Sequence, residues 1–419
     1  MNWPRALAAL ESRNYRLYFA GQIISLTGTW MTQTASLWLV YHLSASPFLL
    51  GLVGFASQSP IFFLAPFAGV LADRVNRHRL LVLTQVLSML QSFALAGLTL
   101  SGAINASWLV ALSLLQGLIN GVDIPVRQAL VIAFVERRQH LGNAIALNSS
   151  LFNLARLTGP ALAGYVIAAV GAGACYLIDG CSYLAVIIGL LAMRLAPTME
   201  QRQVRHPLAE MREGFAYVFG FRPMRVLMIT LAIVSAVGFS YSVLTPMVAK
   251  DTFHGDARVL GYLMSASGVG ALMGAIYLGN RTSIRGLGNV VAFGGALMGL
   301  GLVSFSISKS LAISMASLGV VGLGGVLLMA SSNTLMQSLV EEDKRGRVMS
   351  IFTMSFTGTM PLGNLLVGSV AGTVGPALTF AVAGAICLAV AFVFYRLLPQ
   401  LRAAAAPLFE RLNLVETAS

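Results

Sequence analysis

Two acidic residues stand inside long apolar stretches, where a charge needs a specific reason to be present. Of the fifteen Asp and Glu residues, we place only Asp123 and Asp179 in such stretches. An ionised carboxylate at membrane depth costs roughly 3 kcal/mol or more, so it is a candidate functional group by default. The chemistry open to it is the uptake and release of a proton.

Two arginines are possible partners for Asp123. Arg127 follows it by one helical turn, and Arg156 lies near the middle of the next apolar stretch. We favour an ion pair with Arg156, at which a proton or an anionic substrate group could compete for the guanidinium. In the alternative, Asp123 and Arg127 complete an electrostatic latch with Arg77 at one membrane face, or serve packing alone. The proton-coupling candidates are therefore Asp123, Arg127, Arg156 and Asp179.

The composition identifies the environment of these charges. Hydrophobic residues make up 57% of the chain and charged residues only 10%, and the mean hydropathy is +0.80. A soluble domain has about 25% charged residues, so the chain is predicted to be an integral membrane protein. The net charge of +12 does not indicate nucleic-acid binding, because the basic residues form short clusters between apolar stretches.

About twelve apolar stretches have the length that crosses a bilayer as a helix. We place them near residues 17–40, 48–71, 80–100, 108–132, 141–170, 174–193, 226–249, 260–278, 290–308, 311–335, 348–370 and 377–397. Part of the chain repeats, because Leu130 and Glu136 recur 205 residues later as Leu335 and Glu341. The sequence predicts an all-α membrane protein with twelve transmembrane helices in two pseudo-symmetric six-helix bundles.

Loop charge predicts the topology, because Arg and Lys concentrate on the cytoplasmic side. They cluster in the even-numbered links, which puts both termini in the cytoplasm of a bacterial inner (plasma) membrane protein. We divide the chain into bundles at 1–194 and 226–398, a linker at 195–225 and a tail at 399–419. In the linker, Leu208, Met211, Phe215 and Val218 recur at helical spacing. This helix either lies on the membrane surface or is a solvated linker.

The second link reads GVLADRVNRHR and has a recognisable charge pattern. It resembles the G-x-x-x-D-R-x-G-R-R signature of the major facilitator superfamily at Gly69, Asp73, Arg74, Arg77 and Arg79. Asn76 replaces one glycine, and asparagine also tolerates positive φ. The resemblance implies a cytoplasmic gate, in which the carboxylate binds the positive end of a helix in the other half. An ordinary basic loop is the simpler alternative.

The fifth stretch has a second pattern of small residues, in which Ala155, Gly159, Pro160, Ala163 and Gly164 resemble a motif of the exporter branch. That motif implies antiport, although Gly-Pro with small neighbours is also common where membrane helices pack closely. Phrases such as PVRQAL and NAIALNSSLFNLAR resemble the drug-proton antiporter group that includes the enterobactin exporter and the macrolide efflux proteins. Ser113 replaces the arginine of that group's R-x-x-Q-G motif, so this arginine's role does not carry over.

Polar residues at three- and four-residue steps predict faces that avoid lipid. In the superfamily fold, helices one, four, seven and ten line a central cavity, which implies that several of these faces contact substrate. Hydrogen bonding between helices is the alternative for any single residue. The substrate-cavity candidates are Gln22, Thr29, Trp30, Gln33, Phe152, Ser235, Tyr241, Ser242, Thr334 and Thr357.

No enzyme chemistry is predicted. The five histidines lack a metal-ligand spacing, and no phosphate-binding loop of the G-x-x-x-x-G-K-S type occurs. We therefore expect no cofactor, no metal and no ATP-driven step. The expected function is export of a drug-like or siderophore-like small molecule by proton antiport, by a monomer in the lipid bilayer. The alternatives are a lysophospholipid flippase and a membrane receptor or scaffold that does not transport.

Overall fold

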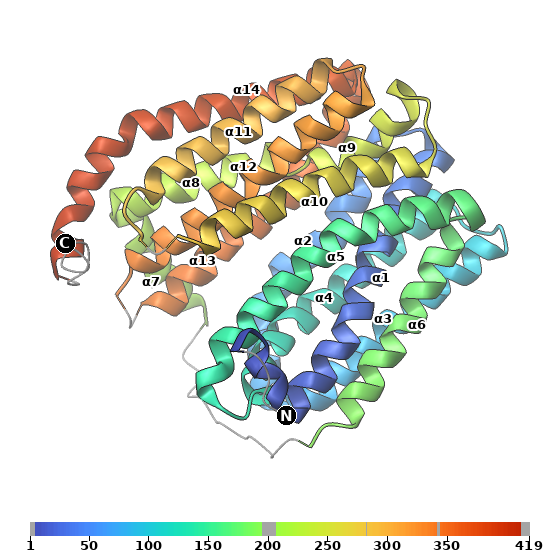
Figure 1. Cartoon of the computed structure of the whole chain (residues 1–419), viewed down its shortest axis with the longest axis horizontal. Helices are drawn as coiled ribbons and strands as arrows, with labels where there is room; N and C mark the ends of the chain where they lie inside the picture. The colour runs from blue at the N-terminus through green and yellow to red at the C-terminus, as the bar shows by residue number, and fades with distance from the viewer. Residues whose placement is uncertain (1–4, 195–206, 282, 342–343, 412–419) are drawn as a thin grey trace. The chain divides into compact units, whose positions relative to one another are not determined.

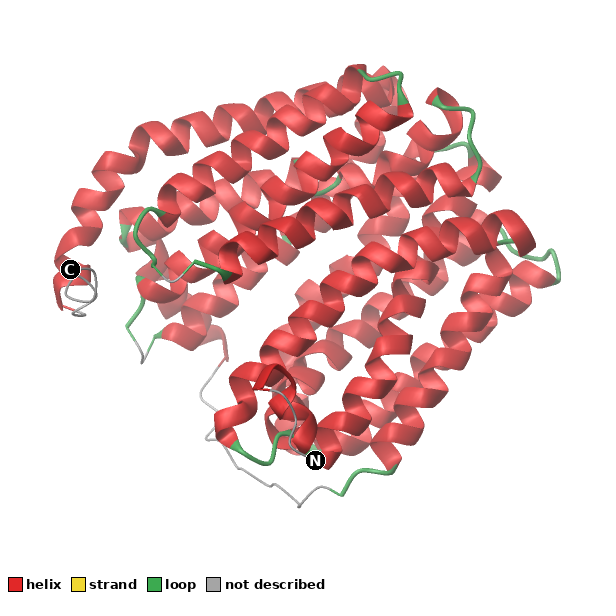
Figure 2. Cartoon of the chain, viewed as in Figure 1, coloured by secondary structure: helices red, strands yellow, loops and turns green. Residues whose placement is uncertain are grey.

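The computed structural model describes the chain except for residues 1–4, 195–206, 282, 342–343 and 412–419. Within helices, the side chains of 5–6, 65–74, 138, 207–211 and 407–411 also lie outside the described residues. All regular structure in the described part is helical (Figure 2). This confirms the predicted all-α class.

The chain divides into two compact units. The first comprises Met1–Val204 and Pro246–Ser265, and the second comprises Arg205–Thr245 and Ala266–Ser419. The segment Pro246–Ser265 thus groups with the first unit, although it follows the linker in the sequence. The helices before the linker are η1 (Arg5–Glu11), α1 (Arg13–Ser44), α2 (Pro47–Arg74), α3 (Arg77–Leu100), α4 (Ala106–Phe134), η2 (Arg138–His140), α5 (Leu141–Val170) and α6 (Ala172–Leu191).

The helices from residue 207 onward cover the rest of the chain. They are α7 (Pro207–Gly220), α8 (Arg222–Val237), α9 (Tyr241–Met247), η3 (Val248–Thr252), α10 (Ala257–Gly279), α11 (Leu287–Ile307), α12 (Leu311–Ser338), α13 (Arg345–Thr357) and α14 (Thr359–Arg411). Nine helical segments of the described residues are long and apolar enough to cross a membrane. The expected number of twelve crossings stays a prediction, because α1 and α5 are not among the nine and 345–406 counts as one segment.

Matching glycines turn the chain at equivalent places. Gly171 separates α5 from α6 with φ 89° and ψ 166°. Gly375, 204 residues later (171 to 375), interrupts α14 with φ 82° and ψ 165°. This is backbone that residues with a Cβ rarely adopt, so glycine serves both turns. The shared conformation agrees with the sequence repeat. Gly375 also lies at the boundary expected between the last two apolar stretches.

Within the first unit, close approach of helices depends on small residues. α1 packs against α5 and α6, and α2 packs against α4. Gly117 of α4 lies against the carbonyl oxygens of Ala56 and Ser57 in α2, and Gly21 of α1 lies against the backbone of Val186 in α6. Small residues allow such contacts in membranes, where the packing of backbones helps to drive helix association.

The second unit is organised around α11, which lies between α12 and α14 (Figure 1). Gly294 of α11 meets Gly324 of α12, and Gly299 of α11 meets Gly384 of α14. The linker helix α7 packs on α13, because Gly214 lies against Ile351. Arg347 also donates to Glu213 at 2.7 Å. The linker helix is therefore held by protein contacts, which neither of the two sequence-based interpretations included.

Candidate transport and coupling site

Asp123 lies in a buried polar network inside the first unit. Its carboxylate is buried, with the side chain 2% exposed, and it forms an ion pair with Arg127 on the next turn of α4. Thr84 and Gln85 of α3 donate to its Oδ1 at 2.7 and 2.6 Å. Arg127 also donates to Gln22 of α1 at 3.3 Å. The network joins three helices, and its acid is neutralised by a neighbouring base.

The expected ion pair between Asp123 and Arg156 does not form in this structure. Arg127 takes that position, because a side chain at i+4 on the same helix lies beside Asp123. Arg156, in α5, is half-buried and makes no ion pair within the described residues. Of the arrangements weighed from the sequence, the structure has the ion pair of Asp123 with Arg127, while a latch that includes Arg77 stays a prediction.

Asp179 of α6 is the second buried acid, and its surroundings are different. Its side chain is buried between α6, α1 and α3, and Ser92 of α3 donates to its Oδ2 at 2.9 Å. The hydroxyl groups of Thr29, Thr32 and Ser182 also lie close to the carboxylate. No basic side chain pairs with it among the described residues. Its neighbours are neutral hydroxyls, so the charge of an ionised Asp179 is not compensated there.

Some hydrogen-bonding capacity at Asp179 is unused. Its Oδ1 and the hydroxyl of Thr32 are buried without a hydrogen-bond partner within the described part of the chain. Buried polar atoms are rarely left unpaired, because each one costs free energy. Protonation of the carboxyl removes its charge and adds a donor. The arrangement therefore suits a group that gains and loses a proton.

The small-residue motif of α5 lies at two close helix contacts. Gly159 lies against Trp30 of α1, where an added Cβ would overlap the tryptophan side chain. Gly164 lies against the backbone of Ala257 and Arg258 at the start of α10. Near these contacts, Ser265 donates to the carbonyl of Leu157 at 2.8 Å. Gly159, Pro160 and Gly164 thus hold α5 against its neighbours within the first unit.

The predicted gate motif falls partly outside the described residues. Gly69, Asp73 and Arg74 belong to the end of α2, and the side chains of Asp73 and Arg74 are not described. Arg79 is exposed at the start of α3. Asn76 does not use positive φ, since its φ is −63°.

Asn76 is instead the N-cap of α3, where its side chain accepts from the backbone N–H of Arg79 at 3.1 Å. Asparagine is among the preferred residues at this position, because its side-chain oxygen satisfies an N–H that the helix leaves unpaired. The turn of this loop is therefore stabilised by the side chain of Asn76 as a helix cap, and not by a positive φ at Asn76 as we expected.

The substrate-cavity candidates separate into exposed and internally bonded side chains. Gln33, Phe152 and Thr334 are exposed, and Trp30 contacts Phe152 with ring centroids 5.6 Å apart. By contrast, Gln22, Ser235 and Tyr241 are buried and hydrogen-bonded, to Arg127, to the carbonyl of Phe356 and to Ser267 respectively. Thr29, Ser242 and Thr357 are half-buried, and their hydroxyls donate to nearby backbone carbonyls, those of Ser25, Phe239 and Thr353 respectively.

Sequence reasoning missed the polar face of α3 that serves both acids. Thr84, Gln85, Ser88, Gln91 and Ser92 are all buried, although they belong to a helix that is long and apolar enough to cross a membrane. Thr84 and Gln85 bond to Asp123, and Ser92 bonds to Asp179. The signal was present, because these five residues recur at one-, three- and four-residue steps in an apolar stretch. We did not predict a polar role for α3, because the family resemblance placed the substrate cavity on helices one, four, seven and ten.

The long apolar helices and the two acids buried among them are typical of a multi-pass membrane transporter. A family model described as "Transmembrane secretion effector" matches residues 5–414. The chain therefore belongs to this family of major facilitator transporters. This confirms the resemblance drawn from its motifs.

Relatives of known name and solved structures agree with this assignment. The staphyloferrin A transporter of Staphylococcus aureus is 27% identical, over 91% of this chain and 95% of its own. The multidrug efflux pump Tap of Mycobacterium tuberculosis is 26% identical, over 85% and 87%. Among solved structures, the nucleoside transporter NupG has a TM-score of 0.71 with 16% identity, over 93% of this chain and 99% of its own. That likeness shows the shared fold.

Proposed function

We propose that this protein exports amphipathic small molecules by proton antiport, with alternating access between two helix bundles. The proposal depends most on one observation, namely that Asp179 is a buried acid without a basic partner in the described part of the chain. Intramembrane acids of this kind commonly mark proton pathways. Membership of a transporter family supplies the context in which such a group has a purpose.

The two buried acids have separate roles in this proposal. Asp179 carries the proton, because its loss of charge on protonation removes an uncompensated cost. Asp123 remains ionised, because Arg127, Thr84 and Gln85 stabilise its charged form. Asp123 and Arg127 thus form a structural link between α1, α3 and α4. This revises the sequence-based hypothesis, in which both acids were candidates for coupling.

The substrate class follows from relatives and from exposed side chains. One relative is named as a transporter of staphyloferrin A, and others as multidrug and macrolide efflux proteins. Trp30 and Phe152 form an aromatic pair, and the exposed Gln33 follows Trp30 by three residues on α1. Aromatic surface with neutral polar groups suits amphipathic compounds, since the rings bury apolar area and the amide orients polar groups. We infer a drug-like or siderophore-like substrate.

Transport into inverted vesicles tests the proposal. Vesicles that contain the full chain are given a panel of dyes, macrolides and siderophores under an imposed pH gradient. We expect Asp179→Asn to abolish uphill accumulation while it preserves downhill exchange, because the neutral amide cannot carry a proton. Asp256→Asn is the matched control, since Asp256 is half-exposed, immediately precedes α10 and pairs with exposed Arg258. Full uphill accumulation by Asp179→Asn would show that the proton assignment is wrong.

A further inference from the structure

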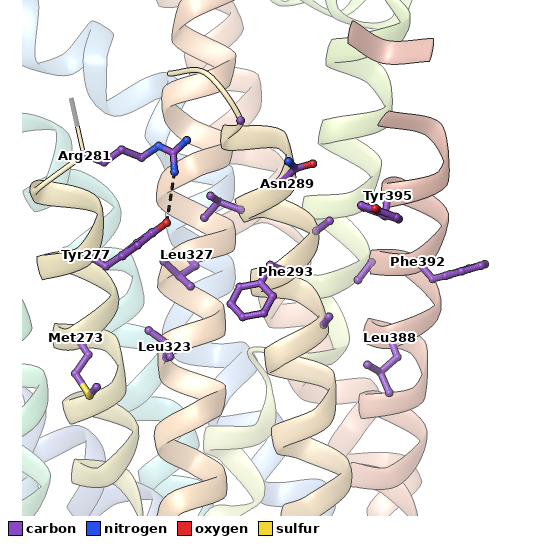
Figure 3. Close-up of a pocket in the computed structure, with 15 residues that line it drawn as sticks. Met273, Tyr277, Arg281, Asn289, Phe293, Leu323, Leu327, Leu388, Phe392 and Tyr395 are labelled. Atoms are coloured by element: carbon purple, nitrogen blue, oxygen red, sulfur yellow. Dashed lines mark hydrogen bonds between the residues drawn. The ribbon is translucent and has the colours of Figure 1, made fainter. Parts of the chain in front are cut away.

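An open groove crosses the surface of the second unit, whereas both buried acids belong to the first unit. It has a volume of about 1070 Å³ and is lined by residues of α10, α11, α12 and α14. This exceeds the range of about 300–1,000 Å³ that is typical of small-molecule sites. Figure 3 shows Leu323 and Leu327 to one side of the central Phe293, and Leu388 and Phe392 to the other. The groove is therefore large enough for a ligand with extended apolar chains.

The groove changes in polarity along its length. Its polar groups, Tyr277, Arg281, Asn289 and Tyr395, gather near the link between α10 and α11 (Figure 3). Away from that link, the lining consists of Met273, Leu323, Leu388 and other apolar side chains. The molecule that fits such a lining has a polar head at one end and hydrocarbon beyond it, oriented as a lipid is within one leaflet.

The charge at the polar end is positive. Arg281 is the single charged residue among those that line the groove, and no acidic residue is part of the lining. A second guanidinium lies at this end, because Arg402 of α14 donates to the side chain of Asn289 at 2.8 Å. The α10–α11 link is cytoplasmic by its arginine content, and the cytoplasmic leaflet carries anionic lipids. The charge of the rim is thus complementary to that leaflet.

Arg281 retains donors for a ligand after its internal bonds are counted. It donates to the carbonyls of Ser283 and Arg285 and to the hydroxyl of Tyr277. A guanidinium has five N–H donors, so two remain after these three bonds. The side-chain amide of Asn289 also keeps its N–H groups, because Arg402 uses only its oxygen. These groups match the acceptor oxygens of a phosphate.

We propose that this groove is a binding site for an anionic phospholipid of the cytoplasmic leaflet. Its phosphate lies at Arg281 and Asn289, and its acyl chains extend along α11 past Phe293. The side chains of Tyr277 and Tyr395 lie at the level of the head group, as tyrosines do at membrane interfaces. The site is separate from the proposed transport reaction, so its test does not depend on export.

Native mass spectrometry of the purified full chain tests this site, with equal amounts of phosphatidylglycerol and phosphatidylcholine in the detergent. We expect wild type to retain one phosphatidylglycerol with about fivefold preference, the effect of roughly one favourable arginine contact at the membrane surface. Ala296→Trp fills the groove and is expected to abolish retention. Leu300→Trp is the matched control, because Leu300 is exposed on the same helix but does not line the groove.

Arg402→Gln and Arg281→Gln separate the charge effect from the fit of the chains. Each is expected to reduce the preference for phosphatidylglycerol while phosphatidylcholine is retained. Arg402→Gln leaves the three hydrogen bonds of Arg281 in place, so it reports on charge without a change in the α10–α11 link. Equal retention of the two lipids by wild type, or unchanged retention in Ala296→Trp, would overturn the proposal and indicate only unspecific lipid around the protein.

Discussion

Gly28 of α1 lies directly against the carboxylate of Asp179 in α6. A Cβ added at Gly28 would stand 2.8 Å from Oδ1 of Asp179 and 3.0 Å from its Cα. The absence of a side chain at Gly28 therefore lets α1 close over the acid. This contact helps to bury Asp179, which has no basic partner in the described part of the chain.

Gly28→Val should disturb both stability and coupling. The new side chain would force α1 and α6 apart, and overpacking of this kind costs roughly 1–3 kcal/mol. We expect a lower melting temperature for the purified protein and a loss of uphill transport. Gly97→Ala in α3 is the control, because nothing lies within 4 Å of a Cβ there, and alanine is favoured over glycine in a helix. Equal melting temperatures for Gly28→Val and wild type would contradict this contact.

Arg127→Gln should destabilise the first unit strongly. It leaves the buried carboxylate of Asp123 without its base, and breaking a buried pair in this way costs roughly 3–5 kcal/mol. The double variant Asp123→Asn with Arg127→Gln removes both charges and should recover much of the loss, as thermal melting would show. Arg156→Gln should melt like wild type, because Arg156 makes no ion pair within the described residues. A larger loss for Arg156→Gln than for Arg127→Gln would reverse our assignment.

Gly164→Leu should impair transport through helix packing. A Cβ at Gly164 would stand 2.7 Å from the carbonyl oxygen of Ala257 and 3.1 Å from the Cα of Arg258. Neither backbone atom can move aside as a flexible side chain can, so α5 and α10 must separate. We expect reduced transport at normal expression, measured in the vesicle assay. Gly142→Leu, in the first turn of α5 with open space around it, should retain activity if the contact at Gly164 is the cause.

The pair between Glu213 and Arg347 should contribute little to stability. The Glu213 side chain is 65% exposed, and pairs of this kind contribute about 0–1 kcal/mol. Glu213→Gln is therefore expected to melt close to wild type at any salt concentration. Gly214→Val, which would meet Ile351 at 2.7 Å, should release α7 from α13 and increase proteolysis of the linker. If Glu213→Gln alone releases the helix, the ion pair rather than the packing holds it.

The sequence determined the helical class, the family and the two acids that require explanation. These properties are local, since hydropathy over about 20 residues and the order of charges along the chain depend on no distant contact. The i+4 spacing of Asp123 and Arg127 was also visible, although we favoured Arg156. Gly171 and Gly375 occupy corresponding places in the repeat, yet their shared positive φ became evident only from their backbone angles.

The tertiary structure decided which groups the acids meet. Ser92 and Thr84 belong to a helix that the sequence did not connect with either acid, and they reach Asp179 and Asp123 across helix interfaces. Which faces meet depends on where glycines such as Gly28 let two backbones approach. That geometry depends on the packing of side chains from several helices, so a one-dimensional pattern does not contain it. The same packing leaves the groove beside Phe293 open.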